Sequence, residues 1–247
     1  MSTLGKTLRF VLWSPFIALG GFFVFSLPPV ASLRWAHPIR TAFMWQRPGA
    51  VGQTWVPLPQ ISAALQSSVV SAEDATFYEH RGVDFREMRE SLKKNRGKRK
   101  YARGFSTITM QLAKNLYLTP EKVIVRKILE IALAFEMEAL LPKERILELY
   151  LNLVEWGPGV YGAEAASRHY FKKTADSLSS GEAAFLAAIL PNPRKWGQWP
   201  PGPYVRKRMD VLQAKKKPLE PLPELPEDEE IPENPRPERG EPIPQDL

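Results

Sequence analysis

An uncharged run near the N-terminus limits how this chain can fold more than any other feature of its sequence. Residues 10–33 contain no charged side chain, and about 20 apolar residues are enough to span a bilayer. The run is longer than the apolar core of a cleaved signal peptide, it carries large aromatic side chains, and Pro28 and Pro29 could end its helix. We therefore expect an uncleaved transmembrane signal anchor over residues 10–33, preceded by a cytoplasmic N-terminus over residues 1–9.

Charged residues flank this run on both sides, so charge alone does not orient it. Lys6 and Arg9 precede the run, as the positive-inside rule favours, but Arg34 and Arg40 follow it. The simpler arrangement keeps the short N-terminus inside the cell and places the large C-terminal part outside the cytoplasm.

Charge is distributed unevenly along the chain. Residues 218–247 hold ten acidic side chains and two arginines, whereas the residues before them hold 32 basic and 17 acidic side chains. A basic body of this kind attracts a polyanion or an anionic surface. Residues 93–103 (KKNRGKRKYAR) alone would fit a nucleic-acid patch, but beside a membrane segment they favour a mobile loop attracted to anionic headgroups. We therefore expect no nucleic-acid partner.

Cysteine and histidine usage narrows the chemistry further. The chain has no cysteine, and its three histidines (His37, His80 and His169) lie far apart in the sequence. These counts exclude a disulfide framework and a cysteine-ligated metal site, and they disfavour a histidine-rich metal site.

Composition divides the remainder of the chain into four parts. Residues 34–57 show no clean period, and their tryptophans and arginines fit a juxtamembrane segment. Residues 58–200 read as helices and form the predicted domain. Residues 201–217 are a basic extension with room for one or two amphipathic turns. Residues 218–247 are acidic and proline-rich, and we expect them to be disordered because they cannot bury enough apolar surface.

Start and stop signals place helices within residues 58–200. Pro59 is placed like a first-turn proline. Residues 119–121 (TPE) are a start signal for a helix that could run to Pro142. A further helix over residues 143–156 ends at a Gly-Pro-Gly breaker.

A capping-box pattern marks one more helix. Ser179 and Glu182 precede an apolar run that Pro191 ends. No run of alternating residues is convincing as a strand, so strands should be few, and no internal repeat is visible. The sequence therefore predicts a mainly α-helical domain.

Glu73 and Asp74 are the first candidate acids, because they directly follow an apolar stretch at residues 61–70. If a helix ends near them, Glu73 lies against the negative end of the helix dipole. That position, together with partial burial, would make its carboxylate a better proton acceptor and a usable general base. The alternative is a frayed, solvated helix end, which the residue types alone favour.

Residues 103–115 (RGFSTITMQLAKN) are a candidate anion site. Gly104 and three hydroxyl side chains offer flexible backbone and hydrogen-bond donors, and Lys114 follows on what looks like a new helix. The alternative, about equally supported, is a polar loop that leads into an ordinary amphipathic helix.

Arg126 and Glu130 form the third candidate feature. They stand four residues apart and share one face of a helix. Most pairs with this spacing lie on the solvent side, which is the alternative here. Yet Glu130 is flanked by Leu129 and Ile131, and Lys122 lies on the same face as Arg126, so two cations point the same way.

Five stretches, taken in order, resemble the motifs of the peptidoglycan glycosyltransferase family, which includes the transglycosylase module of class A penicillin-binding proteins. They are EDATFYEHRGVD (73–84), RGFSTITMQLAKN (103–115), RKILE (126–130), KERILELYLN (143–152) and the run from GVYGAEAASRHYF (159–171) to EAAFLAAILPNP (182–193). Any one stretch would be a weak signal, but five in order with sensible spacing are a strong one.

The resemblance implies a lysozyme-like helical fold with a small membrane-proximal lobe, in the monofunctional form, because no penicillin-binding domain follows residue 200. It implies polymerisation of lipid II into glycan strands, with inversion at the anomeric carbon and release of a polyprenyl diphosphate, on the periplasmic side of the plasma (inner) membrane. The expected partners are lipid II, the growing glycan strand and the membrane. The proline-rich tail could also bind cell-wall synthesis proteins.

The resemblance also assigns roles to individual residues. Glu73 matches the general base that deprotonates the acceptor 4-hydroxyl, and Glu130 matches a second essential acid near the donor diphosphate. The residues expected to bind the diphosphate or the substrate are Lys114, Lys122, Arg126, Ser106, Thr107, Gln111 and Asn152. A divalent cation, Mg²⁺ or Mn²⁺, could assist at the diphosphate, although no ligand set in the sequence identifies its site. Acids with a row of cations suit departure of a diphosphate better than hydrolysis.

One position departs from the family pattern. The second motif usually has two glycines before its serine, and here Phe105 stands in place of the second. A phenylalanine restricts the backbone and could slow loop opening, or its ring could dip into the bilayer.

Two other functions stay open at the level of sequence. A lytic or hydrolytic muramidase on a similar scaffold would use Glu73 as a general acid, but the cations would then have no task. A membrane-tethered adaptor without enzymatic activity would bind its partners through the proline-rich tail.

Overall fold

The structure, a computed structural model, describes residues 13–14, 21, 24–47, 49, 52–95, 105–119 and 124–214. Much of the predicted anchor (10–33) lies outside these residues, as do the predicted N-terminus (1–9) and tail (218–247). Among the helices of the described residues, none has the length and apolar character that crossing a membrane requires. The anchor and the tail therefore stay predictions.

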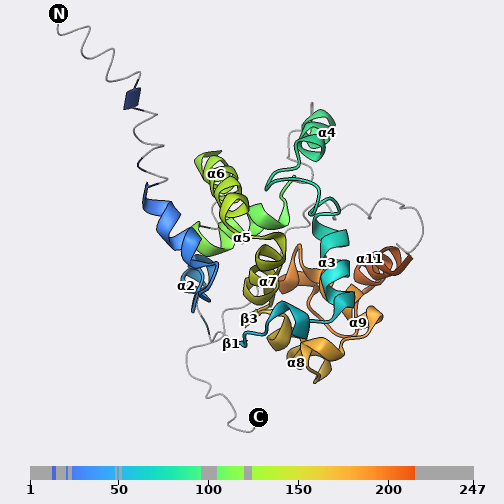
Figure 1. The fold of residues 1–247 in the computed structure, drawn as a ribbon. Coiled ribbons are helices and arrows are strands. Elements are labelled where there is room, and N and C mark those ends of the chain that lie inside the picture. Colours follow the sequence, from blue (N-terminus) through green and yellow to red (C-terminus); the bar gives the residue numbers. More distant parts are fainter. Residues whose placement is uncertain are drawn as a thin grey trace, which may run out of the picture.

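The described residues form a mainly helical domain, as the sequence predicts (Figure 1). A helix over residues 24–32 leads into it from the N-terminal side. The elements that follow are α2 (Ala42–Gln46), β1 (Gly52–Gln53), η1 (Leu58–Gln60), α3 (Ala63–Glu73), α4 (Phe85–Asn95), α5 (Ile108–Tyr117), α6 (Ile124–Leu140), α7 (Lys143–Leu153), β2 (Glu155–Gly157), β3 (Val160–Tyr161), α8 (Ala163–Phe171), η2 (Ala175–Ser177), α9 (Ser180–Ile189), α10 (Pro193–Trp196) and α11 (Pro203–Ala214).

Helix α9 lies at the centre of the larger part of the domain, which we call the body and which comprises α3, α5, α7, α8, α9 and α11. Residues 183–189 of α9 are all buried, and the helix packs against both α3 and α11. A helix that is apolar on all sides belongs in an interior. The predicted capping box is confirmed, because Ser179 and Glu182 bind each other's backbone N–H, and α9 ends just before Pro191.

The start of α3 corrects one expectation from the sequence. Pro59 does not begin this helix but lies in the separate short turn η1. Helix α3 begins at Ala63, after Ser62, whose Oγ accepts a hydrogen bond from the N–H of Ala64 at 3.2 Å. A serine cap satisfies a backbone donor that a proline start would leave without a partner. The helix ends at Glu73, where the sequence analysis places a helix end.

A three-stranded sheet in the order β1–β3–β2 lies beside α8. The prediction of helix over residues 143–156 was wrong at its end, because α7 stops at Leu153 and β2 follows. The reason is tertiary packing. Trp156 is fully buried, while the neighbouring Glu155 pairs with arginines from α10 and from the end of α2. An extended backbone sends adjacent side chains to opposite faces, as these two contacts require.

Segments on both sides of residues 58–200 contribute to the fold. Residues 34–57, predicted as juxtamembrane, supply α2 and β1, and β1 pairs with β3 in parallel. Helix α11 is longer than the one or two turns expected there. Its Val205 and Leu212 are buried in the main core.

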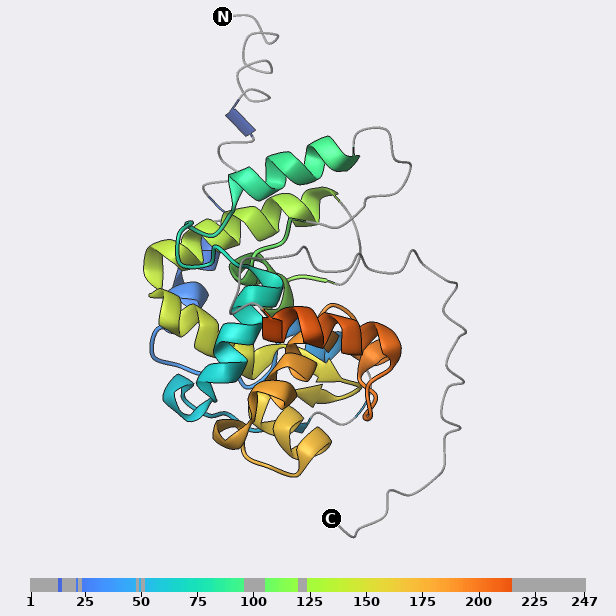
Figure 2. The same cartoon turned by 90° about the vertical axis from the view of Figure 1, so that its right-hand side faces the viewer.

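Helices α4 and α6 form a smaller part, which we call the lobe. It lies at one end of the molecule in both views, the end from which the helix over residues 24–32 leads away (Figures 1 and 2). Phe85 of α4 stacks on Phe135 of α6, with ring centroids 6.3 Å apart. Helix α6 ends at Leu140, just before Pro142, as predicted, whereas its predicted start at residues 119–121 is only partly described. The lobe exposes the apolar side chains Ile124, Val125, Ile128, Phe135 and Phe85.

Candidate active site

Glu73 lies at the C-terminal end of α3 and is partly buried. Its Oε2 accepts a hydrogen bond from Nε2 of Gln111 on α5, at 2.9 Å. The helix end is therefore held by a neighbouring helix, and the frayed end that the sequence also allowed is not what the structure has.

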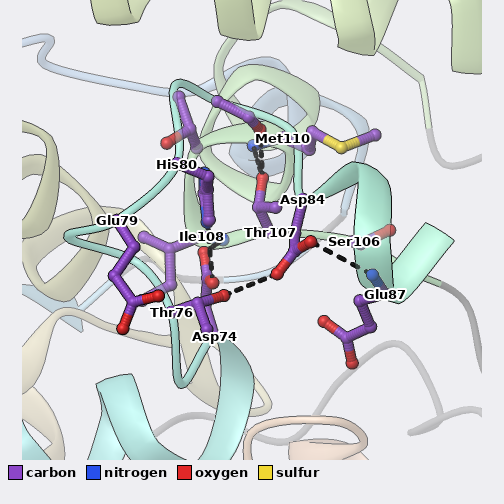
Figure 3. A network of polar contacts seen from close by, with 12 residues as sticks. Asp74, Thr76, Glu79, His80, Asp84, Glu87, Ser106, Thr107, Ile108 and Met110 are labelled. Atoms are coloured by element: carbon purple, nitrogen blue, oxygen red, sulfur yellow. Dashed lines mark hydrogen bonds and ion pairs between the residues drawn. The ribbon is translucent and has the colours of Figure 1, made fainter.

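Asp74, the acid next to Glu73, is engaged in the fold. It is 2% exposed. Its Oδ1 lies 2.8 Å from Nε2 of His80, and its Oδ2 accepts a hydrogen bond from the N–H of Ile108 at 3.0 Å (Figure 3). Because Ile108 is the first residue of α5, Asp74 fixes the end of α3 against the start of α5.

Gly82 brings the loop after Asp74 against α6. Its φ is 84°, and a Cβ at this position would lie 2.9 Å from the carbonyl oxygen of Ala134. A residue without a side chain fits both the conformation and the close approach. The Gly82 carbonyl accepts a hydrogen bond from Oγ1 of Thr107 at 2.6 Å. The loop, the start of α5 and helix α6 therefore meet at one point.

Glu130 on α6 is 2% exposed and is paired with two cations. Arg126, one turn earlier, binds its Oε1, and Nζ of Lys127 lies 3.0 Å from its Oε2. The predicted pair of Arg126 and Glu130 is present, but it is buried, so the solvent-side alternative is wrong. A carboxylate this deep in a protein is stable as an ion only when cations or donors compensate it.

Ser106 connects the two acids. Nζ of Lys127 donates to its Oγ at 2.8 Å, and Nε2 of Gln111 donates to its carbonyl oxygen at 3.5 Å. Gln111 also binds Glu73, and Lys127 also binds Glu130. A continuous hydrogen-bonded path, which we call the acid path, therefore joins the two carboxylates.

Lys114 on α5 lies beside the acid path. Burial lowers the pKa of Lys114, and the carboxylate of Glu130 opposes that shift. The positive charges of Arg126, Lys127 and Arg47 lower the pKa further, because like charges disfavour another cation. Several cations around one buried carboxylate leave a net positive charge, which favours the binding of an anion.

Asn152 and Thr107, two residues expected in the site, both make hydrogen bonds that hold the fold together. Asn152 is fully buried. Its Oδ1 accepts from the N–H of Val56, and its Nδ2 donates to the carbonyls of Val56 and Glu148, each at 2.9 Å. It therefore holds the segment after β1 against α7, apart from the acid path. Thr107 is the N-cap of α5, and Lys122 lies outside the described residues.

Phe105 packs into the lobe. It is partly buried against Val83, Met110 and Ala134. The ring also carries a cation on its face, because Nζ of Lys127 lies 5.0 Å from the ring centroid. Such contacts stabilise a cation at a fixed place. The residue that departs from the family motif thus supports the lysine that binds Glu130.

A family model supports the resemblance drawn from the motifs. The model, described as Transglycosylase, matches residues 42–216.

The chain belongs to the transglycosylase family.

All five motif stretches lie within the match, which begins at α2 and extends past α11. The resemblance inferred from the sequence is thus confirmed.

Proteins of several bacteria are similar to the chain over most of its length, and each is named a biosynthetic peptidoglycan transglycosylase. The protein of Nitrobacter hamburgensis is 45% identical over 177 residues, which cover 70% of this chain and 78% of the relative. That of Aeromonas hydrophila is 43% identical over 208 residues, or 84% and 86% of the two chains. That of Paraburkholderia xenovorans is 41% identical over 197 residues, or 76% and 82%.

Three residues near the site were not singled out from the sequence. Lys127 stands three residues before Glu130, and that spacing could have indicated the contact. Tyr150 donates its hydroxyl hydrogen to Oε1 of Gln111 at 2.9 Å across 39 positions of sequence, and no local pattern indicates this. Arg47 and Lys114 both contact the ring of Phe43. The ring centroid lies 4.9 Å from the Arg47 guanidinium and 5.5 Å from Nζ of Lys114.

The donor set does not fit a metal ion held by the protein. Within the described residues, no group of three or more histidines and acids gathers as a metal site would need. Magnesium sites beside phosphates usually use one or two carboxylates, but both oxygens of Glu130 are engaged by cations. We therefore derive no step from Mg²⁺ or Mn²⁺.

Proposed function

We propose that this chain is a peptidoglycan glycosyltransferase that polymerises lipid II into glycan strands. One observation carries the proposal, namely the acid path that joins Glu73 to Glu130 with Lys114 beside it. Glycosyl transfer from a lipid diphosphate needs a base for the acceptor hydroxyl and cations for the leaving group. The names of the relatives, biosynthetic peptidoglycan transglycosylases, support the same reaction.

In the proposed reaction Glu73 accepts the proton of the acceptor 4-hydroxyl while that oxygen attacks the anomeric carbon of the donor. The new bond joins this oxygen to the anomeric carbon, and the bond to the diphosphate breaks on the opposite face, so the configuration inverts. The NH₂ group of Gln111 holds the Glu73 carboxylate in place. Glu73 then releases the proton to solvent before the next cycle.

The cations stabilise the diphosphate as it leaves. Arg126 and Lys127 are held in place by Glu130. Donors fixed in advance stabilise developing negative charge without reorganising during the reaction. A diphosphate bound beside Lys114 would also favour the charged form of that amine, which its cationic neighbours disfavour. Glu130 acts in this scheme as the acid that orders the cations.

We further infer that the lobe faces the membrane, with the body on the periplasmic side of the plasma (inner) membrane and residues 10–33 as the anchor. Exposed apolar side chains on α4 and α6 support this orientation. The helix over residues 24–32 leads away from the same end (Figure 1). Oγ of Ser26 in this helix donates to Oε2 of Glu136 on α6 at 2.7 Å. A lysozyme-like fold with a membrane-proximal lobe, which the family resemblance implies, is part of the proposal.

The direct test incubates the purified full chain with lipid II. We expect long, lysozyme-sensitive glycan from the wild-type protein and none from Glu73→Gln, because an amide cannot accept the proton. The matched control is Glu79→Gln, which changes an exposed acid in the loop after α3 and should polymerise normally.

One outcome would overturn the proposed base, and another would overturn the proposed function. Full polymerisation by Glu73→Gln would remove the base from the mechanism. Release of soluble muropeptides from purified cell walls, without polymer from lipid II, would favour the muramidase. Deleting residues 218–247 tests the adaptor hypothesis, since unchanged polymerisation would confine the tail to a regulatory role.

A further inference from the structure

Tyr150 is a fully buried tyrosine of α7 whose hydroxyl group reaches the acid path. The hydroxyl donates to Oε1 of Gln111 at 2.9 Å. The other end of the same amide, Nε2, donates to Oε2 of Glu73 at 2.9 Å and lies 3.5 Å from the carbonyl oxygen of Ser106. Both ends of the Gln111 side chain are therefore engaged, and its oxygen is engaged by Tyr150.

The Tyr150 hydroxyl keeps its proton throughout the range in which enzymes work. Burial raises the pKa of Tyr150 well above its ordinary value, and the negative charges of Glu73 and Asp74 raise it further. Tyr150 can therefore always donate to Gln111. Asp74 is itself bound to His80 and to the backbone of α5, so it does not compete for the Gln111 amide.

The orientation of the Gln111 amide determines whether its NH₂ group or its oxygen faces the Glu73 carboxylate. The two ends of a carboxamide are nearly equal in size, so shape alone does not distinguish them. With NH₂ toward Glu73 the contact stabilises the carboxylate, whereas a flipped amide would place oxygen against oxygen. A buried acceptor left without a donor costs free energy, so the Tyr150 hydroxyl stabilises the orientation that serves Glu73.

We propose that Tyr150 is a positioning residue of the reaction, which holds the Gln111 amide so that its NH₂ end orients the Glu73 carboxylate toward the acceptor sugar. The proposal rests on the proposed function of Glu73 as base. Tyr150 touches no substrate, because it is fully buried, and it acts through Gln111 alone.

The first experiment compares Tyr150→Phe with Tyr170→Phe. Tyr170 is the control, because its partly buried hydroxyl also donates to carbonyl oxygens, of Trp156 at 2.8 Å and of Gly197 at 3.4 Å, but lies in a different part of the body. We expect Tyr150→Phe to lower kcat about tenfold with little change in KM. The acid limb of its pH–rate profile should move to higher pH, since Glu73 loses an oriented donor. Tyr170→Phe should change neither quantity.

A double-variant cycle tests whether Tyr150 acts through Gln111. In a Gln111→Ala background, Tyr150→Phe should have no further effect on kcat or on the pH profile, so the two losses should not add. Equal losses in both backgrounds would overturn the proposal, because Tyr150 would then act through the fold. A wild-type kcat and pH profile in Tyr150→Phe would overturn it as well.

A spectroscopic measurement applies even if Tyr150→Phe fails to fold. Placing 3-fluorotyrosine at position 150 keeps the ring and its O–H, and its ¹⁹F resonance should titrate with Glu73. The titration should disappear in Glu73→Gln and in Gln111→Ala. Because Asp74 and His80 also lie nearby, a titration that persists in both variants would assign the signal to them and would contradict the proposal.

The outcomes also separate this inference from the proposed function. If Glu73→Gln makes no polymer while Tyr150→Phe behaves like the wild-type protein, the function stands and the role of Tyr150 fails. If Glu73→Gln polymerises normally, the proposed mechanism itself fails. The ¹⁹F titration needs no turnover, so it reports on the coupling of Tyr150 to Glu73 in either case.

Discussion

In the body, α9 buries apolar side chains on every side, whereas in the lobe α6 leaves Ile124, Val125 and Ile128 on the surface. The body therefore satisfies its apolar groups internally, and the lobe presents them to its surroundings. Helix α5 of the body also contacts the lobe. Its Leu112 packs into the main core, while its Met110 packs against Val83 and against Ala134 of α6 in a separate small cluster. The acid path therefore lies at the boundary between a part that buries its apolar side chains and a part that leaves several of them exposed.

The largest expected effect tests the body. Phe185 of α9 is fully buried against Tyr170, with ring centroids 5.2 Å apart. Phe185→Ala should lower the free energy of unfolding by about 3–5 kcal/mol, because it removes buried surface and leaves a cavity. Phe135→Ala in the lobe should cost far less, since that ring is 40% exposed. Chemical denaturation measures the free energy of unfolding of both variants. Equal losses would contradict the difference in packing between the body and the lobe.

The next effect tests the boundary. Glu130→Gln should reduce polymerisation about 10²–10³-fold, because Arg126 and Lys127 lose the charge that positions them. Glu138→Gln is the matched control. It also removes a buried charge from α6, one that pairs with Lys143 at 2.8 Å. It should lower stability while retaining activity, and a similar fall in both activities would assign the loss to folding.

A smaller effect tests the surface of the lobe. Replacing Val125 and Ile128 by serine should weaken binding to lipid vesicles about tenfold, because two apolar side chains no longer leave water. The free energy of unfolding should stay within about 0.5 kcal/mol of the wild-type value, as expected for exposed positions. Vesicle flotation and denaturation measure the two quantities. Unchanged flotation would show that this face does not contact lipid.

The smallest effect concerns how the lobe is attached at its start. Asp84 precedes α4, and its Oδ1 accepts from the N–H of Glu87 at 3.1 Å (Figure 3). The same oxygen accepts from the N–H of Arg86 at 2.8 Å. Burial would raise the pKa of Asp84. Hydrogen bonds from the Thr76 hydroxyl and from these two N–H groups, with the charge of Arg86, lower it below the ordinary value of 3.8.

The sign of the pH dependence follows from this depressed pKa. The contribution of Asp84, about 1 kcal/mol for such a cap, is present above the unfolded pKa near 3.8 and is lost as the pH falls through the lower folded value. The hydrogen-exchange protection of α4, taken relative to the intrinsic exchange rate at each pH, should therefore fall in acid, and Asp84→Asn should flatten that response. Asp176→Asn, at an exposed acid of the body, is the control and should leave it unchanged.

The sequence predicted the local parts of this structure well. The capping box at Ser179 and Glu182, the helix end at Glu73 and the pairing of Arg126 with Glu130 all depend on residues close together in the chain. Capping and spacing rules describe such contacts, because the backbone alone brings the partners together.

Contacts between distant segments were not predicted from the sequence. Residues 155–156 continue a helical pattern locally, yet burial of Trp156 and the arginine partners of Glu155 favour a strand there. The hydrogen bond from Tyr150 to Gln111 and that from Asn152 to the carbonyl of Val56 also join segments that are far apart in the sequence. These choices depend on which elements pack together, and periodicity carries no information about that.

The close approach at Gly82 limits how far the loop after Glu73 and helix α6 can lie apart. A Cβ at residue 82, in the loop after Glu73, would lie 2.9 Å from the carbonyl oxygen of Ala134 on α6, the helix that carries Glu130. The loop that follows Glu73 can approach the helix that carries Glu130 this closely only because residue 82 has no side chain. Even one added methyl group at position 82 would push the loop and α6 apart, and with them the segments that carry the two acids.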